Sequence, residues 1–175
     1  MEKAVAFIGL GVMGYPMAGY LSKAGYSTKV YNRTLAKAEK WAGEYDGQAC
    51  ETPKQAAEGS DIVFVCVGND DDVRSVVYGD DGIIAGLKPG AVLVDHTTTS
   101  AELAVELAKA AQDSGHQFID APVSGGQAGA ENGVLTVMAG GQSSTFDKVE
   151  PVMKAYARHS QLMGNVGSGQ LAKMV

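Results

Sequence analysis

Short apolar runs alternate with helical patterns along the whole chain. Several runs, such as residues 62–67, are almost continuously apolar, which is typical of strands that are covered on both faces of a sheet. Other runs are shorter and less uniform, but they recur at similar intervals. The predicted strands are residues 4–8, 28–31, 62–67, 91–94, 117–119, 134–139 and 159–163.

Helical patterns fill the intervals between these runs, and several have recognisable ends. Thr34 is expected to cap one helix, and Thr52 followed by Pro53 opens a short one. Thr99 and Glu102 form a capping box at the start of the clearest helix. The predicted helices are residues 12–24, 35–45, 53–58, 100–113, 143–156 and 170–175. This alternation implies right-handed crossovers, so we predict an α/β fold with a doubly wound, mostly parallel sheet.

Composition and charge exclude several classes of protein. Hydrophobic residues make up 45% of the chain and charged residues 19%, which are ordinary values for a globular domain. The formal net charge of −6 argues against a nucleic acid or an anionic membrane as partner. Residues 4–22 carry no charge, but their glycines and Pro16 are unsuited to a membrane-spanning helix. Cys50 and Cys66 form no C-x-x-C pair, so we expect buried thiols and a reducing, cytoplasmic compartment.

Histidine and acidic residues give no sign of a metal site. The spacing of His96, His116 and His159 matches no metal-binding motif, so no metal is predicted. Residues 70–72 are three consecutive aspartates, which are expected to favour a helix N-terminus through its dipole. Residues 80–82 resemble a turn.

The segment after the first predicted strand contains the pattern G-x-G-x-x-G. It consists of Gly9, Leu10, Gly11, Val12, Met13 and Gly14. The pattern follows a buried strand and opens a helix, as dinucleotide binding requires. Gly9 permits a tight turn, Gly11 lets the backbone approach a pyrophosphate, and Gly14 lets helix and strand pack closely. A Rossmann-type domain with phosphates at the helix N-terminus is therefore predicted, the alternative being a glycine-rich turn without a ligand.

The end of the second predicted strand bears on the choice of dinucleotide. NAD enzymes usually carry Asp or Glu there, where the ribose hydroxyls bind. This chain has Asn32, Arg33 and Thr34, with no acid before Glu39. A guanidinium at Arg33 can bind a 2′-phosphate. We therefore expect NADP as cofactor, with NAD as the alternative if Arg33 is only an exposed charge.

Three loops leave the carboxyl ends of predicted strands, where open parallel sheets bind their ligands. Two of them are expected along the ribose and the nicotinamide. They contain Val67, Gly68 and Asn69 in one loop and Thr98 in the other. The third loop offers the hydroxyl of Ser124 and the N–H groups of Gly125 and Gly126, which suit a substrate carboxylate. Each segment could equally be an ordinary loop that is rich in turn-forming residues.

Three motifs in order resemble those of the β-hydroxyacid dehydrogenase family. They are residues 9–18, residues 120–126 and the pattern Gly164-x-x-Gly167-x-Gly169-x-x-x-Lys173. The family includes 3-hydroxyisobutyrate dehydrogenase and the glyoxylate/succinic semialdehyde reductases. The resemblance implies that Lys173 is the general acid/base, that Ser124, Gly125 and Gly126 orient the substrate, and that Thr98 lies near the nicotinamide.

The resemblance also implies a second domain. Members of the family have an all-helical C-terminal domain that follows a long interdomain helix, closes the active site and builds the dimer. The pattern at residues 170–175 is barely two turns long, and a helix that short is marginal by itself. We therefore expect residues 1–163 to form the NADP-binding domain and residues 164–175 to begin the interdomain helix, with the helical domain missing. The full-length form is expected to be a homo-oligomer, and the fragment alone to be inactive.

The function expected from these observations is hydride transfer. The chain is predicted to come from an NADP-dependent oxidoreductase that acts on a small β-hydroxy acid, a carboxylate substrate, or on its semialdehyde. One alternative is an imine reductase on the same scaffold. Another is a non-catalytic dinucleotide-binding module. The resemblance disfavours both, since such relatives usually lack a lysine at the position of Lys173.

Overall fold

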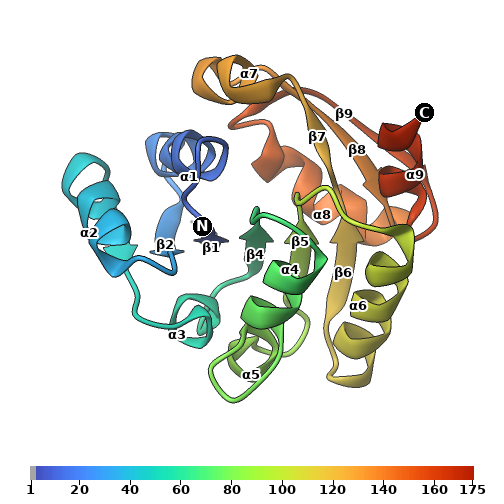
Figure 1. The fold of residues 1–175 in the computed structure, drawn as a ribbon, viewed down its shortest axis with the longest axis horizontal. Helices are drawn as coiled ribbons and strands as arrows, with labels where there is room; N and C mark the ends of the chain where they lie inside the picture. Colours follow the sequence, from blue (N-terminus) through green and yellow to red (C-terminus); the bar gives the residue numbers. More distant parts are fainter. Residues whose placement is uncertain (1–2) are drawn as a thin grey trace.

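The strands of this chain are short and most are deeply buried. The structure is a computed structural model that describes residues 3–175. The strands are β1 (Ala4–Ile8), β2 (Ser27–Tyr31), β3 (Gln48–Ala49), β4 (Ile62–Val65), β5 (Val92–Asp95), β6 (Gln117–Asp120), β7 (Val123–Ser124), β8 (Leu135–Gly140) and β9 (Ala157–Gly164). Figure 1 shows their order in space.

Helices connect most of these strands. They are α1 (Gly14–Lys23), α2 (Leu35–Glu44), α3 (Pro53–Ala57), α4 (Asp70–Val77), α5 (Ile83–Gly86), α6 (Ala101–Asp113), α7 (Gly126–Asn132), α8 (Ser143–Met153) and α9 (Ser168–Met174). Among the described residues, no helix is both long and apolar enough to cross a membrane.

The strands of residues 3–175 form one mixed sheet. Its order is β3-β2-β1-β4-β5-β6-β8-β7, and β9 pairs with β8. The first six strands of this path are parallel to one another, in the order that Rossmann domains use. Strand β8 runs antiparallel to both β6 and β7. The predicted fold, a doubly wound and mostly parallel sheet, is confirmed.

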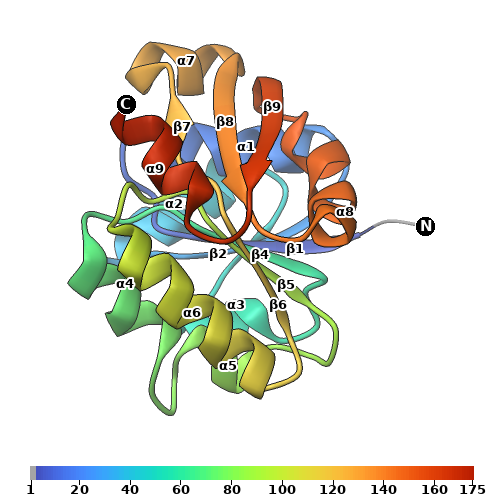
Figure 2. The same cartoon turned by 90° about the vertical axis from the view of Figure 1, so that its right-hand side faces the viewer.

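Alternate side chains of the central strands enter two separate cores. Val5 and Phe7 of β1 pack on one face with helices α1, α2, α7 and α8. Ala6 and Ile8 pack on the other face with α3, α4, α5 and α6. Figure 2 shows the two helical layers on opposite sides of the sheet. Because both faces are covered, the central strands need apolar residues at every position, which explains the continuous runs in the sequence.

Some helix ends differ from their predicted positions. The capping box at Thr99 is wrong by one residue: Ser100 is the N-cap of α6, and its hydroxyl accepts a hydrogen bond from the N–H of Leu103 at 3.1 Å. Thr34 stands at the N-cap of α2, but its side chain makes no capping bond. The Thr52 cap is confirmed, since its hydroxyl accepts from the N–H of Gln55 at 3.1 Å.

Four short elements were not predicted, and α4 was expected only as a helix N-terminus at residues 70–72. Strands β3 and β7 have two residues each, and helices α5 and α7 have four and seven. The boundary expected between residues 163 and 164 falls within β9, which continues to Gly164. Helix α9 then packs against β8, β9, β6 and α6.

Candidate functional site

The glycine loop between β1 and α1 is held tightly against its neighbours. Gly9 has φ +101°, and a Cβ there would overlap the carbonyl oxygen of Cys66. Its N–H donates to the carbonyl of Tyr31 at 2.9 Å, which ties the loop to the end of β2. A Cβ on Gly14 would overlap the carbonyl oxygen of Gly9. Both positions therefore require glycine for steric reasons.

Gly11 is in a different situation, because its surroundings are open. A Cβ on Gly11 would meet no atom within 4 Å. The N–H groups of Gly11, Val12 and Met13 have no hydrogen-bond partner among the described residues. Free N–H groups before a helix form a cradle for an anion, so the loop fits a dinucleotide pyrophosphate.

A cleft of about 390 Å³ opens beside this loop. Its lining contains most of the residues predicted to bind the cofactor: Gly9, Leu10, Gly11, Val12, Met13, Gly14, Asn32, Arg33, Thr34, Val67 and Gly68. The side-chain oxygen of Asn32 accepts from the N–H of Leu10 at 3.0 Å, which holds the two parts of the lining together. Arg33 makes no ion pair or hydrogen bond within residues 3–175.

Two residues predicted to bind the cofactor lie outside the lining of the cleft. Asn69 is the N-cap of α4, and its side-chain oxygen accepts from the N–H of Asp72 at 2.9 Å. Thr98 is exposed in the loop that follows β5. Other wall residues were missed by the sequence analysis, and they are Ile8, Tyr31, Cys66, Asp72, Ser75 and Val76.

The predicted substrate residues lie next to the predicted acid/base. The ammonium nitrogen of Lys173 on α9 donates to the carbonyl oxygen of Val123 at 2.8 Å, and Val123 immediately precedes Ser124. Ser124, Gly125 and Gly126 are exposed, and both glycines have positive φ, +130° and +62°. The structure thus brings together two motifs that are about 50 residues apart in the sequence.

Helix α9 is anchored by two fully buried polar residues that the sequence analysis did not select. The carboxylate of Asp120 accepts from the N–H groups of Gly167 at 2.8 Å and of Gln170 at 3.1 Å. The amide of Gln170 donates to the carbonyl of Thr97 at 2.8 Å and accepts from the N–H of Thr99 at 3.0 Å. Helix α9 is therefore bonded to the end of β6 and to the loop that follows β5.

Burial changes the protonation of the groups beneath this edge of the sheet. Burial raises the pKa of Asp95 to about 7, although Thr97 donates to its carboxylate and opposes the shift. Burial also raises the pKa of Asp120, against the bonds from the backbone of α9. The two side chains are register partners on β5 and β6. Two buried carboxyls so close together favour at least one protonated form near neutral pH.

His96 has a structural role. Its Nδ1 lies 2.6 Å from the carbonyl oxygen of Ala121, so this nitrogen carries the proton. Its Nε2 then accepts from the hydroxyl of Tyr156 at 2.6 Å, and the ring stacks on Phe64. Burial lowers the pKa of His96 to about 4, so the imidazole is neutral. Within the described residues, no group of His, Cys, Asp and Glu is assembled as a metal site.

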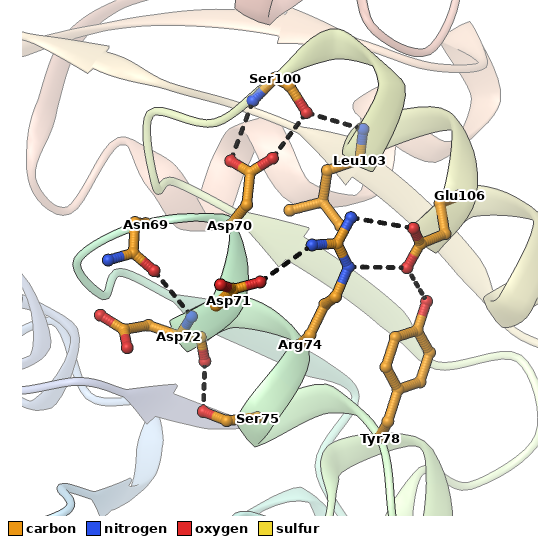
Figure 3. A network of polar contacts seen from close by, with 10 residues as sticks. All are labelled: Asn69, Asp70, Asp71, Asp72, Arg74, Ser75, Tyr78, Ser100, Leu103 and Glu106. Carbon is orange, nitrogen blue, oxygen red and sulfur yellow. Dashed lines mark hydrogen bonds and ion pairs between the residues drawn. The ribbon is translucent and has the colours of Figure 1, made fainter.

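A polar network joins α4 to α6 beside the cleft (Figure 3). Asp70 accepts from the hydroxyl of Ser100 at 2.7 Å and from its N–H at 3.1 Å. Arg74 forms two bonds with the carboxylate of Glu106, at 3.1 and 3.3 Å. Tyr78 donates to the same carboxylate at 2.7 Å. The network holds α4 in place, which is the helix that forms one wall of the cleft.

Comparisons with known proteins agree with this geometry. Residues 4–167 match the family model described as the NAD binding domain of 6-phosphogluconate dehydrogenase. An uncharacterized oxidoreductase of Shewanella frigidimarina is 61% identical over 171 residues, covering 98% of this chain and 59% of that protein. A probable 3-hydroxyisobutyrate dehydrogenase-like protein of Arabidopsis thaliana is 44% identical, covering 97% and 56%. The NAD-dependent L-serine dehydrogenase of Pseudomonas aeruginosa is 36% identical, covering 98% and 57%.

Solved structures share the fold over nearly the whole chain. The 3-hydroxyisobutyrate dehydrogenase of Mycobacterium tuberculosis with L-serine has a TM-score of 0.91 and 31% identity, covering 99% of this chain and 58% of that one. Psf3 in complex with NADP+ and 2-OPP has a TM-score of 0.92 and 27% identity, covering 98% and 60%. The chain thus spans less than two thirds of the length of the relatives it matches. It belongs to the family of 6-phosphogluconate dehydrogenase NAD-binding domains and is similar to 3-hydroxyisobutyrate dehydrogenase-like oxidoreductases.

Proposed function

We propose that this chain is the cofactor-binding part of an NADP-dependent oxidoreductase that acts on a small β-hydroxy acid or its semialdehyde. One observation carries the proposal. Lys173 bonds to Val123, and this contact places a lysine beside the Ser124 loop, at the carboxyl edge of the sheet. The same edge contains the cleft with the glycine loop. An acid/base, a carboxylate-binding loop and a dinucleotide cradle therefore share one edge of the sheet.

NADP is the cofactor that the cleft supports best. Arg33 lines the cleft, is exposed and has no carboxylate partner within residues 3–175, so its guanidinium is free for a 2′-phosphate. The relatives differ in this respect. Psf3 was solved with NADP+, whereas the Pseudomonas aeruginosa enzyme is described as NAD-dependent. Arg33 is the residue of this chain that argues for the phosphorylated form.

The proposed substrate class follows from the chemistry of the Ser124 loop and from the relatives. L-Serine and 3-hydroxyisobutyrate, after which relatives of this chain are named, are both carboxylic acids with a hydroxyl on the β-carbon. The hydroxyl of Ser124 and the free backbone of Gly125 and Gly126 offer donors for such a carboxylate. Once this loop holds the carboxylate, the fixed separation between carboxylate and β-hydroxyl sets the position at which Lys173 must exchange a proton with that hydroxyl.

The proposed mechanism assigns one task to each part of the site. When bound at the glycine loop, the nicotinamide cofactor supplies or accepts the hydride. Ser124, Gly125 and Gly126 hold the substrate carboxylate and so orient the reacting carbon. As the neutral amine, Lys173 takes the proton from the substrate hydroxyl during oxidation; as the ammonium, it gives that proton to the carbonyl oxygen during reduction. Asp120 and Gln170 hold α9 and so keep Lys173 beside the loop. In this enzyme, α9 is the beginning of the interdomain helix.

The decisive experiment combines binding with turnover. The 175-residue chain is titrated with NADPH and with NADH by cofactor fluorescence, and tighter binding of NADPH is expected. In the whole protein that carries this chain, formation of NADPH from 3-hydroxyisobutyrate and from L-serine is followed at 340 nm. Replacing Lys173→Met should lower kcat by about a hundredfold or more, with cofactor binding unchanged. The exposed Lys109→Met is the matched control. Undiminished turnover in the Lys173 variant would contradict the assignment of the acid/base.

A further inference from the structure

Helix α4 contributes one wall of the cleft through a single face. Asp72, Ser75 and Val76 line the cleft, and they are spaced three and four residues apart, as neighbours on one side of a helix are. None of them belongs to the glycine loop or to the Asn32-Arg33-Thr34 segment. This wall therefore adds an apolar side chain, a hydroxyl and the one carboxylate found among the described residues that line the cleft.

The carboxylate of Asp72 is free, unlike those of its neighbours. Asp70 is bonded to Ser100, and Asp71 is paired with Arg74 at 3.2 Å. The backbone of Asp72 is also engaged, since its N–H donates to Asn69. Its carboxylate oxygens have no hydrogen-bond or ion-pair partner in the described part of the chain, and Figure 3 shows them pointing away from the Arg74–Glu106 pair.

The carboxylate is also directed toward the floor of the cleft. A Cβ on Gly68 would lie 2.5 Å from Asp72 Oδ2, so the carboxylate lies directly over the loop that follows β4. Gly68 itself lines the cleft. Asp72 is half-buried there, and a free acceptor in this position is available to a ligand.

The order of groups along the cleft indicates which part of the ligand meets this wall. The pyrophosphate belongs at the N–H groups of the glycine loop, and the ribose 2′ position belongs at Arg33, at the end of β2. The purine ring is the part that has not been assigned a partner. A purine needs an apolar surface for its face and polar partners for its edge, and Val76 and Asp72 provide one of each.

Resting on the proposed function, we propose that Asp72 selects adenine, by accepting a hydrogen bond from the exocyclic amine of the purine. A carboxylate only accepts hydrogen bonds, so it favours the amine of adenine over the oxo group of hypoxanthine. The alternative position, beside the ribose, is unfavourable because the carboxylate would then repel the 2′-phosphate that Arg33 binds.

The experiment compares NADPH with its deamino analogue, in which hypoxanthine replaces adenine, in fluorescence titrations of the 175-residue chain. The unaltered protein should bind NADPH about tenfold more tightly than the analogue. In Asp72→Asn the side-chain amide can donate to the oxo group as well as accept from the amine, so this preference should fall to about twofold or less. Asp71→Asn is the matched control, since it removes the same charge one residue away and outside the cleft. It should keep the full preference.

The outcomes separate this inference from the proposed function. Equal binding of NADPH and its analogue by the unaltered protein overturns the role of Asp72 and leaves cofactor binding standing. If Asp72→Asn binds NADPH more tightly than the unaltered protein does, with NADH affinity unchanged, the carboxylate lies beside the 2′-phosphate. That result would also overturn the role of Asp72 in selecting adenine. If neither NADPH nor NADH binds to a chain whose circular dichroism shows it to be folded, both proposals fail.

Discussion

The buried amide of Gln170 holds the backbone on both sides of Thr98. It donates to the carbonyl of Thr97 at 2.8 Å and accepts from the N–H of Thr99 at 3.0 Å. Gln170 lies one helical turn before Lys173, whose ammonium contacts Val123. One short helix thereby sets the spacing between the loop of Thr98 and the loop of Ser124.

Removing this amide should loosen α9. In Gln170→Met the side chain keeps a similar volume but leaves Thr97 O and Thr99 N without partners, so we expect a loss of about 1–3 kcal/mol in the free energy of unfolding. Urea denaturation measures this loss, and hydrogen exchange should show faster exchange of the α9 amides. Gln112→Met, at an exposed position of α6, is the control and should change stability by less than about 0.5 kcal/mol.

The glycine loop allows folding and ligand binding to be separated. Gly14→Ala should destabilise the protein by about 1–3 kcal/mol, because its Cβ would overlap the carbonyl of Gly9. Gly11→Ala should leave the thermal midpoint nearly unchanged, since its Cβ enters open space. It should nevertheless weaken NADPH binding, because that space is where the backbone receives the phosphates. Calorimetry and cofactor titration check both expectations, and full NADPH affinity in Gly11→Ala would argue against a phosphate site there.

The preference for NADPH should depend on Arg33. We expect Arg33→Ser to weaken NADPH about tenfold or more, because a charge-assisted bond to the 2′-phosphate is lost, and to change NADH by less than about twofold. Lys37→Ser removes a nearby exposed charge that does not line the cleft, and serves as the control. Equal losses for both cofactors would show that Arg33 does not contact the 2′ position.

Asp95 should make stability depend on pH. Its pKa is raised to about 7 in the folded state, above its ordinary value of 3.8, so the folded protein retains a proton that the unfolded chain loses. The contribution of Asp95 to the free energy of unfolding is therefore fully present below about pH 4 and is lost as the pH rises to about 7. Asparagine does not titrate, so the free energy of unfolding of Asp95→Asn should rise relative to that of the unaltered protein between pH 4 and pH 7. The difference should reach about 1–4 kcal/mol at pH 7.

The measurement for Asp95 must be a difference between two proteins. His96 has its folded pKa lowered to about 4, so its own contribution to stability increases with pH and opposes that of Asp95. Urea denaturation of both proteins at several pH values cancels the His96 contribution, because both proteins contain it. A difference that stays constant from pH 4 to pH 7 would show that Asp95 does not titrate in this range.

Several structural features could be predicted because they depend on neighbouring residues in the chain. Buried parallel strands require continuous apolar runs, so β1, β4 and β5 are visible in the sequence. The glycine loop is visible because sterics restrict Gly9 and Gly14 to one residue type, in a local strand–loop–helix order. The small elements β7 and α7 were missed, since β7 exists only through its pairing with β8, and α7 packs against the distant helix α1.

The mostly parallel sheet, the glycine loop and Arg33 just after β2 were all predictable from local sequence patterns. Which face of α4 lines the cleft, and hence the presence of Asp72 there, depends instead on how α4 packs in the folded chain. The burial of Asp120 and Gln170, which hold α9 against the end of β6 and the loop after β5, likewise depends on tertiary packing. The physical reason is that strands and turns are specified by local backbone and burial requirements. The neighbours of a polar side chain, in contrast, are known only when distant segments have packed.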